Sequence, residues 1–293
     1  MSTIFDSHSH PQMRQYDPVK LPDGSHGASN DREEMLKRAK DAGVSIICVG
    51  TDLKTSKQGI ELAQRYKGIW ATVGIHPNDA PESIKWQVLS IKEYEDLLKE
   101  ERIVAIGEIG LDYYRTPESY KQEEQKAVFS QFLDLAIKYN KPVVIHSRDA
   151  AKGSTGKVHQ DVLSILNTKY LIHHTNLHGV AHSFTGNIEQ AEQYIKNGFY
   201  LGFNGIITFP SSRKAMKDTV PGMYDEVVKY APLDRILLET DAPFLAPEPY
   251  RGKRNEPAYV IEVAKKVAEL KDESLEKVIK QTTENCRKLF NLI

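Results

Sequence analysis

The sequence predicts an α/β protein with a (β/α)8 TIM-barrel fold. Two observations predict it: short apolar runs alternate with amphipathic segments, and eight such runs fit within 293 residues. A doubly wound open sheet is the alternative. No G-x-G-x-x-G follows the first run, which disfavours the dinucleotide-binding version of that sheet. The apolar runs cover 3–8, 45–51, 69–77, 103–110, 142–148, 179–184, 199–205 and 236–243.

The runs and the segments between them differ in pattern. Each run is almost continuously apolar, as expected of parallel strands that are covered on both faces. The segment 31–43 (DREEMLKRAKDAG) begins with acidic residues and ends at a glycine, and 117–140 ends at an asparagine, which are features of helix ends. No repeat and no linker rich in Pro, Gly or Ser divides the chain, so we expect one domain over 1–293.

Composition limits the classes of function. Hydrophobic residues make up 40% and charged residues 27% of the chain, the balance of a globular enzyme. The net charge of −1 argues against a protein that coats long nucleic acids, but leaves room for a local basic patch. Cys48 and Cys286 are the only cysteines, which excludes a disulfide framework and favours a cytoplasmic location. We expect no membrane association, because no signal-peptide pattern and no membrane-length apolar run is present.

The polar residues that follow the runs are of metal-binding types. His8 and His10 in the opening DSHSH share one face of an extended strand, because side chains alternate along it. The strands' carboxyl ends meet at the active-site end of such a barrel. Even four of these histidines and two of the carboxylates are too many ligands for one tetrahedral ion, and they suit two divalent ions bridged by a carboxylate. The strand-end residues are His8, His10, His76, Glu108, His146 with Arg148 beyond it, His182, and Asp241 preceded by Glu239.

Other histidines and other catalytic patterns are less informative. The histidines of HHTNLH (173–178) precede the sixth run, so we expect them at the opposite end of the barrel. Neither H-E-x-x-H nor G-x-S-x-G occurs, which disfavours a helix-borne protease zinc site and a serine-hydrolase elbow.

Seven motifs, in order, resemble those of the TatD family of metal-dependent deoxyribonucleases, within the amidohydrolase-like barrels. They are DSHSH, VGIHP, GEIGLDYY, VIHSRDA, HSFTG, ETDAPFLAP and RGKRNEP, spread over residues 6–257. The resemblance implies two divalent metal ions. His8, His10 and Asp241 would hold the first, His146 and His182 the second, and Glu108 would bridge them. Mg²⁺ is the ion implied for the reaction, although four histidines would hold Zn²⁺, Mn²⁺ or Ni²⁺ more tightly.

The resemblance also implies a function. The expected activity is 3′–5′ exodeoxyribonuclease action on single-stranded or frayed DNA ends, through a water activated by two metals. Asp241 would take the proton of that water, and His76 and Arg148 would orient the phosphate. A hydrolase of an amide, ester or lactone that uses the same two metals is the alternative, and a binding protein without activity is a third reading.

Two further segments are expected to contact the substrate. The basic residues Arg251, Lys253 and Arg254 follow the last run, where they could grip the phosphate backbone of a DNA end. Tyr113 and Tyr114 could stack on a terminal base, or one of them could pack beneath the barrel rim. We expect a monomer.

Overall fold

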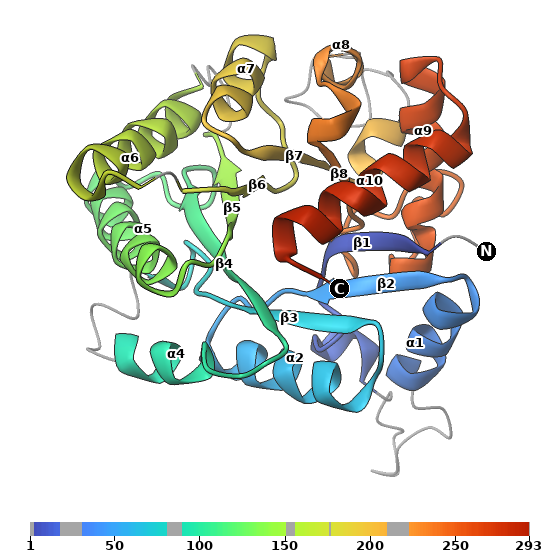
Figure 1. The fold of residues 1–293 in the computed structure, drawn as a ribbon, viewed down its shortest axis with the longest axis horizontal. Coiled ribbons are helices and arrows are strands. Elements are labelled where there is room, and N and C mark those ends of the chain that lie inside the picture. Colours follow the sequence, from blue (N-terminus) through green and yellow to red (C-terminus); the bar gives the residue numbers. More distant parts are fainter. Residues whose placement is uncertain are drawn as a thin grey trace.

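A closed barrel of parallel strands forms the centre of the protein. The computed structural model describes residues 3–17, 31–80, 90–150, 156–175, 177–209 and 223–292. Each predicted apolar run overlaps one strand, and neighbours in sequence pair in order from β1 to β8 (Figure 1). The barrel closes where Asp241 N donates to His8 O (2.9 Å) and His10 N donates to Ala242 O (2.7 Å). The (β/α)8 prediction is therefore confirmed. The strands are β1 (Ile4–Ser9), β2 (Val44–Cys48), β3 (Ile69–Val73), β4 (Ile103–Asp112), β5 (Val143–Arg148), β6 (Gly179–Ala181), β7 (Tyr200–Phe203) and β8 (Ile236–Leu238).

Helices surround the barrel, and their ends carry the expected signals. Helix α2 begins at a capping box in which the Asp52 side chain accepts from Thr55 N. Helix α5 (Ser119–Tyr139) is followed by Asn140, which adopts the left-handed conformation that asparagine tolerates. No helix of the described segments is long and apolar enough to cross a bilayer. The helices are α1 (Asp31–Asp41), α2 (Leu53–Arg65), α4 (Ile91–Leu97), α5 (Ser119–Tyr139), α6 (Lys157–His173), α7 (Ile188–Lys196), α8 (Met223–Tyr230), α9 (Val260–Lys271) and α10 (Leu275–Phe290).

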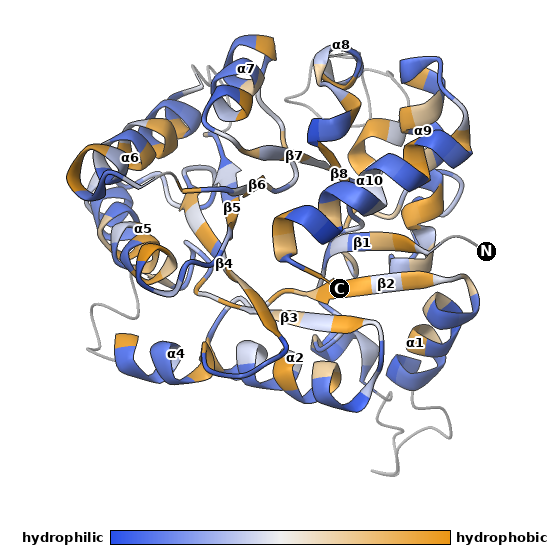
Figure 2. Cartoon of the chain, in the orientation of Figure 1, coloured by the Kyte–Doolittle hydropathy of each residue, from blue (hydrophilic) through white to orange (hydrophobic). Residues whose placement is uncertain are grey.

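The strands separate two apolar clusters. The larger cluster lies between the outer strand faces and the surrounding helices, whose apolar sides face the barrel (Figure 2). The smaller cluster fills the amino-terminal part of the barrel and is covered by the end of α10, which crosses the barrel opening in Figure 1. It contains Phe5, Ile47, Val49, Val104, Ala105, Val144, Val180, Tyr200 and Leu237 from the strand segments, and Cys286, Leu289, Phe290 and Leu292 from the C-terminal segment.

Two strands carry an irregularity that the sequence pattern did not predict. Between Asp6 and Ser9, β1 has one residue more than its partner β2, and between Ile106 and Ile109, β4 has one residue more than β5. An extra residue changes which side chains face inward beyond it. In β1, Phe5 can therefore lie in the inner apolar cluster while His8 and His10 lie in the polar cluster at the other end.

Candidate metal centre

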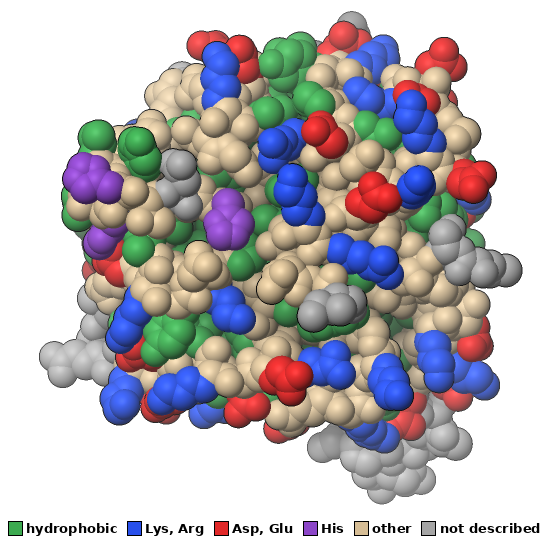
Figure 3. All heavy atoms as spheres, in the orientation of Figure 1, with side chains coloured by type: hydrophobic (Ala, Val, Ile, Leu, Met, Phe, Trp, Pro, Cys, Tyr) green, Lys and Arg blue, Asp and Glu red, His purple; other side chains and the backbone are tan. Residues whose placement is uncertain are grey.

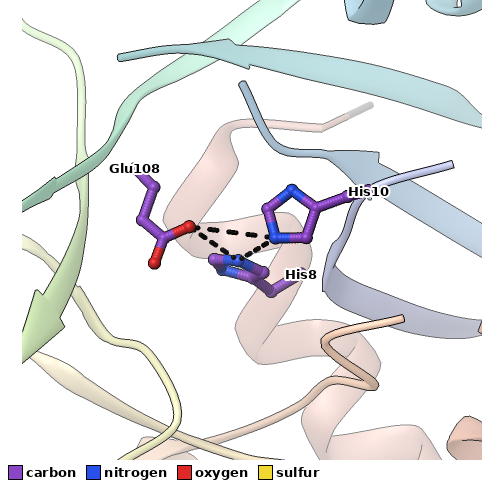
Figure 4. A group of neighbouring side chains, drawn as sticks. All are labelled: His8, His10 and Glu108. Atoms are coloured by element: carbon purple, nitrogen blue, oxygen red, sulfur yellow. Dashed lines mark hydrogen bonds and ion pairs between the residues drawn. The ribbon is translucent and has the colours of Figure 1, made fainter. Parts of the chain in front are cut away.

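His8, His10 and Glu108 form one group of buried donor atoms (Figure 4). His8 Nε2 lies 3.2 Å from His10 Nε2 and 3.5 Å from Glu108 Oε2, and His10 Nε2 lies 3.8 Å from that same oxygen. Bonds of about 2.0–2.1 Å to a tetrahedral ion place its ligand atoms about 3.4 Å apart. The separations of the three atoms therefore suit a shared metal ion.

The second oxygen of Glu108 faces different histidines. Glu108 Oε1 accepts from His146 Nδ1 at 2.8 Å and lies 4.0 Å from His182 Nε2. His76 Nε2 approaches the same oxygen at 3.7 Å. Glu108 thus stands between two sets of histidines, with one carboxylate oxygen toward each, which is the arrangement that a bridging ligand requires.

Asp241 completes the cluster from the end of β8. Its Oδ1 lies 3.4 Å from His10 Nε2 and 3.8 Å from His182 Nε2. The structure thus brings together the six side chains predicted as metal ligands. Glu108 and His146 lie within β4 and β5 rather than at the strand ends, because both strands continue beyond them.

Burial and charge set the protonation of these groups. Burial lowers the pKa of His8 to about 4, with the nearby His182 as the next cause, so His8 is neutral at pH 7, the form that ligates metals. Burial alone would raise the pKa of Glu108, but His76, His146 and His8 hold it well below its usual range. Burial also opposes ionisation of Asp241, and its contact with His10 and the charge of His182 lower its pKa instead. The carboxylates that face His10, His146 and His182 raise the pKa of these three histidines, against the effect of burial. A divalent ion binds neutral imidazole and ionised carboxylate, so an ion that binds here would displace protons from these histidines, and the types of donor fit the metal.

Two further carboxylates contact the cluster histidines, a role that the sequence analysis did not predict. Glu239 Oε1 lies 2.9 Å from His182 Nδ1 and also accepts from Ser183 N at 2.6 Å. Asp112 Oδ2 lies 3.3 Å from His146 Nε2. A carboxylate on the second ring nitrogen commonly orients a ligating histidine. Glu239 lies in the motif ETD and Asp112 in GLD, so both acids were visible in the sequence. Only the structure shows that Glu239 pairs with His182 and Asp112 with His146.

The residues predicted to orient phosphate lie beside this cluster. The His76 ring lies edge-on to the His146 ring, with centroids 4.5 Å apart. Burial, and then the charge of His146, lower the pKa of His76, so His76 is a neutral hydrogen-bonding group. The Arg148 guanidinium lies 4.0 Å from the centroid of the Tyr114 ring.

Tyr113 requires a correction. Its side chain is only 2% exposed, and its hydroxyl donates to Asp161 Oδ2 at 2.5 Å. A buried ring cannot stack on an incoming base. Tyr114, the next residue, is 43% exposed, so the alternative in which one tyrosine packs beneath the rim describes Tyr113.

The basic segment after β8 divides into three environments. Arg254 pairs with Asp31, donates to Gln15 O, and lies over the Tyr16 ring. Its guanidinium is therefore engaged by other parts of the chain, which gives Arg254 a structural role. The Arg251 guanidinium lies 3.8 Å from the centroid of the Phe209 ring. Lys253 is exposed. The three residues therefore differ in their surroundings, and Lys253 is the exposed one of the three. Their contact with a DNA backbone stays a prediction.

The HHTNLH segment lies where the sequence predicted. His173 ends α6, and the carbonyl of His178 accepts from Val143 N at the amino end of β5. The described histidines of this segment are thus at the opposite end of the barrel from the metal-binding cluster.

Comparisons with known proteins agree with this geometry. The family model described as TatD related DNase matches residues 5–291. The uncharacterized metal-dependent hydrolase YabD of Bacillus subtilis is 39% identical over 292 residues, 99% of each chain. The 3′–5′ ssDNA/RNA exonuclease TatD of Pectobacterium carotovorum is 34% identical, over 89% of this chain and 94% of that relative. The crystal structure of YJJV, a TatD homolog from Escherichia coli, superposes with a TM-score of 0.78 at 27% identity, covering 99% of this chain and 98% of that one.

The match spans nearly the whole chain and includes every residue of the histidine and carboxylate cluster. On these grounds, the chain belongs to the TatD family of metal-dependent hydrolases, in the amidohydrolase superfamily.

Proposed function

We propose that this chain is a two-metal phosphodiesterase that removes nucleotides from the 3′ ends of single-stranded or frayed DNA. The observation that carries the proposal is the division of Glu108, with Oε2 toward His8 and His10 and Oε1 toward His146 and His182. Two divalent ions bound by these residues would activate a water and offset the charge that develops on a phosphate. The named activity of the Pectobacterium relative supports the choice of a nucleic-acid substrate.

The chain's own residues would divide the remaining work. Asp241 is ionised, since its pKa is lowered, and its Oδ1 lies between His10 and His182, so it can accept the proton of the attacking water. The Arg148 guanidinium lies over the Tyr114 ring, and its N–H groups would donate to a phosphate. His76, neutral and beside His146, would donate a hydrogen bond to the same phosphate.

The deciding experiment supplies metals to stripped protein. Metal-free protein is incubated with oligonucleotides labelled at either end, single- or double-stranded, and Mg²⁺, Mn²⁺ or Zn²⁺ is added back. We expect stepwise shortening from the 3′ end that requires added metal and is slowed about 10²-fold or more in Asp241→Asn, the usual loss for a positioned base. Glu192→Ala, an exposed substitution on α7, is the matched control with parental activity.

The carbonyl-hydrolase alternative predicts a different result. Hydrolysis of amide, ester or lactone substrates by the metal-loaded protein, with no cleavage of any oligonucleotide, would overturn the phosphodiesterase proposal.

A further inference from the structure

An aromatic side chain lies exposed beside the first group of predicted metal ligands. Phe244 is 44% exposed, and its ring lies edge-on to that of His10, with centroids 6.4 Å apart. Single exposed apolar side chains are common, so exposure alone means little. Within the described part of the chain, however, Phe244 is the one non-histidine ring that contacts a ring of the predicted metal ligands.

The backbone around Phe244 is held firmly. Phe244 N donates to Asp241 O at 2.8 Å, which closes a tight turn after β8. The buried Asn255 side chain donates to Phe244 O at 2.6 Å and to Thr240 O at 2.8 Å. These bonds hold the backbone of Phe244 close to that of Asp241, so the turn that carries the ring is ordered before a ligand packs on it.

The other exposed aromatic near the cluster is already in contact with a cation. Tyr114 carries the Arg148 guanidinium over its ring, on the side of the cluster where Asp112 pairs with His146. No cation of the described segments lies over Phe244. A free aromatic face thus stands on the His10 and Asp241 side, and a guanidinium, which is suited to phosphate, stands on the other.

We propose that Phe244 is the platform on which the base of the bound terminal nucleotide stacks; this rests on the proposed phosphodiesterase function. Within a nucleotide, only the sugar separates the base from the phosphate. A phosphate held between the two ligand sets would therefore place its base within reach of a ring in contact with His10. Stacking on a phenyl ring tolerates every base, as an enzyme that shortens DNA of any sequence requires.

Binding is tested without catalysis. Phe244→Trp places a fluorescent reporter at the site, and metal-free protein is titrated with an oligothymidylate and with a base-free deoxyribose-phosphate oligomer. The parent protein, which has two tryptophans, supplies the background signal. We expect saturable quenching of the new tryptophan by the oligothymidylate and little by the base-free strand. Tyr170→Trp, an exposed aromatic near the end of α6, is the matched control and should respond to neither.

Kinetics separate stacking from chemistry. Phe244→Ala should raise the KM for an oligonucleotide by roughly 5- to 150-fold, the range expected for the loss of one base–aromatic stack. Phe244→Tyr keeps an aromatic ring and should keep most of the affinity. Cleavage of the base-free strand should be the same in parent and Phe244→Ala. If the parent cleaves oligonucleotides and Phe244→Ala changes both substrates equally or neither, the platform is refuted and the nuclease stands. If the parent cleaves neither strand with any metal, the proposed function itself fails.

Discussion

The two ends of the barrel are made by the same eight strands and have opposite chemistry. At the amino end, the inner side chains are apolar and pack against the last turns of α10. The face seen in Figure 3 has positive and negative side chains interspersed. At the carboxyl end, buried histidines and carboxylates lie within ion-pair distance of one another.

The apolar amino end of the barrel therefore contributes mainly to stability, and the polar carboxyl end carries the candidate functional site. Burial of apolar surface stabilises the folded chain, whereas burial of ionisable groups costs free energy unless partners compensate it. At the carboxyl end, each buried imidazole of the metal-binding cluster faces a carboxylate, which offsets that cost. Substitutions at the two ends should therefore change different measured quantities.

The largest effect is expected at Glu108, at the polar end. Glu108→Ala removes both oxygens that face the two histidine sets, so we expect metal loss at both positions and hydrolysis below detection. The barrel should still fold, because Glu108 lies outside the two apolar clusters. Metal analysis and circular dichroism measure the two results. Full metal occupancy with near-parental turnover would show that Glu108 does not bridge.

Phe290 provides the opposite test at the apolar end. Its side chain is 2% exposed and belongs to the cluster that fills the barrel, so Phe290→Ala should lower the free energy of unfolding by about 3–5 kcal/mol. Urea unfolding of metal-free protein measures this, with Phe290→Leu as a milder variant. Metal content and KM should not change in the folded fraction. A variant that lost metal without losing stability would contradict the separation of the two ends.

His159 sharpens the comparison, because it is a buried histidine near the polar end that faces away from the metal-binding cluster. It contacts Ser147 Oγ (3.4 Å) and the Tyr194 hydroxyl (3.3 Å), and burial lowers its pKa to about 4. As the pH falls below 6.5, His159 becomes protonated in the unfolded chain but stays neutral in the folded chain. The contribution of neutral, buried His159 to the free energy of unfolding is therefore present above pH 6.5 and is lost as the pH falls toward 4. His159→Gln should remove up to about 3 kcal/mol of that acid sensitivity.

Unfolding of the parent and His159→Gln at pH 7.5 and pH 4.5 measures this difference. His174→Gln, at an exposed histidine after α6, is the control. An identical pH dependence in His159→Gln and the parent would assign the acid sensitivity to other groups.

The smallest effect is expected at Lys253, on the rim of the polar end. Lys253→Gln should raise the KM for single-stranded DNA a few-fold and flatten the slope of log affinity against log salt by about 0.7, the value for one lost phosphate contact. Arg254→Gln should mainly reduce stability, because Arg254 pairs with Asp31 and stacks on Tyr16. Salt titrations of binding and thermal unfolding distinguish the two. A stronger salt effect in Arg254→Gln than in Lys253→Gln would reverse these roles.

Local sequence pattern was sufficient for the fold and for the types of residue at the site. The β-branched runs each overlap a strand, because a buried parallel strand needs apolar side chains on both faces. His8, His10, His182 and Asp241 could be placed together from sequence, because the strands' carboxyl ends meet at one end of any such barrel.

Tertiary structure alone decided which side chains face the centre of the barrel and which charged or aromatic side chains remain exposed. The extra residues in β1 and β4 change the inward-facing set, and they depend on pairing with neighbouring strands, which no single run encodes. Tyr113 and Tyr114 are identical and adjacent in sequence, yet one is bonded to Asp161 of α6 and the other is exposed. Arg254 is engaged by Asp31, 223 residues away in the chain. Local sequence determines strand, helix and residue type, whereas the availability of a charge or a ring depends on partners that only the closed barrel brings into contact.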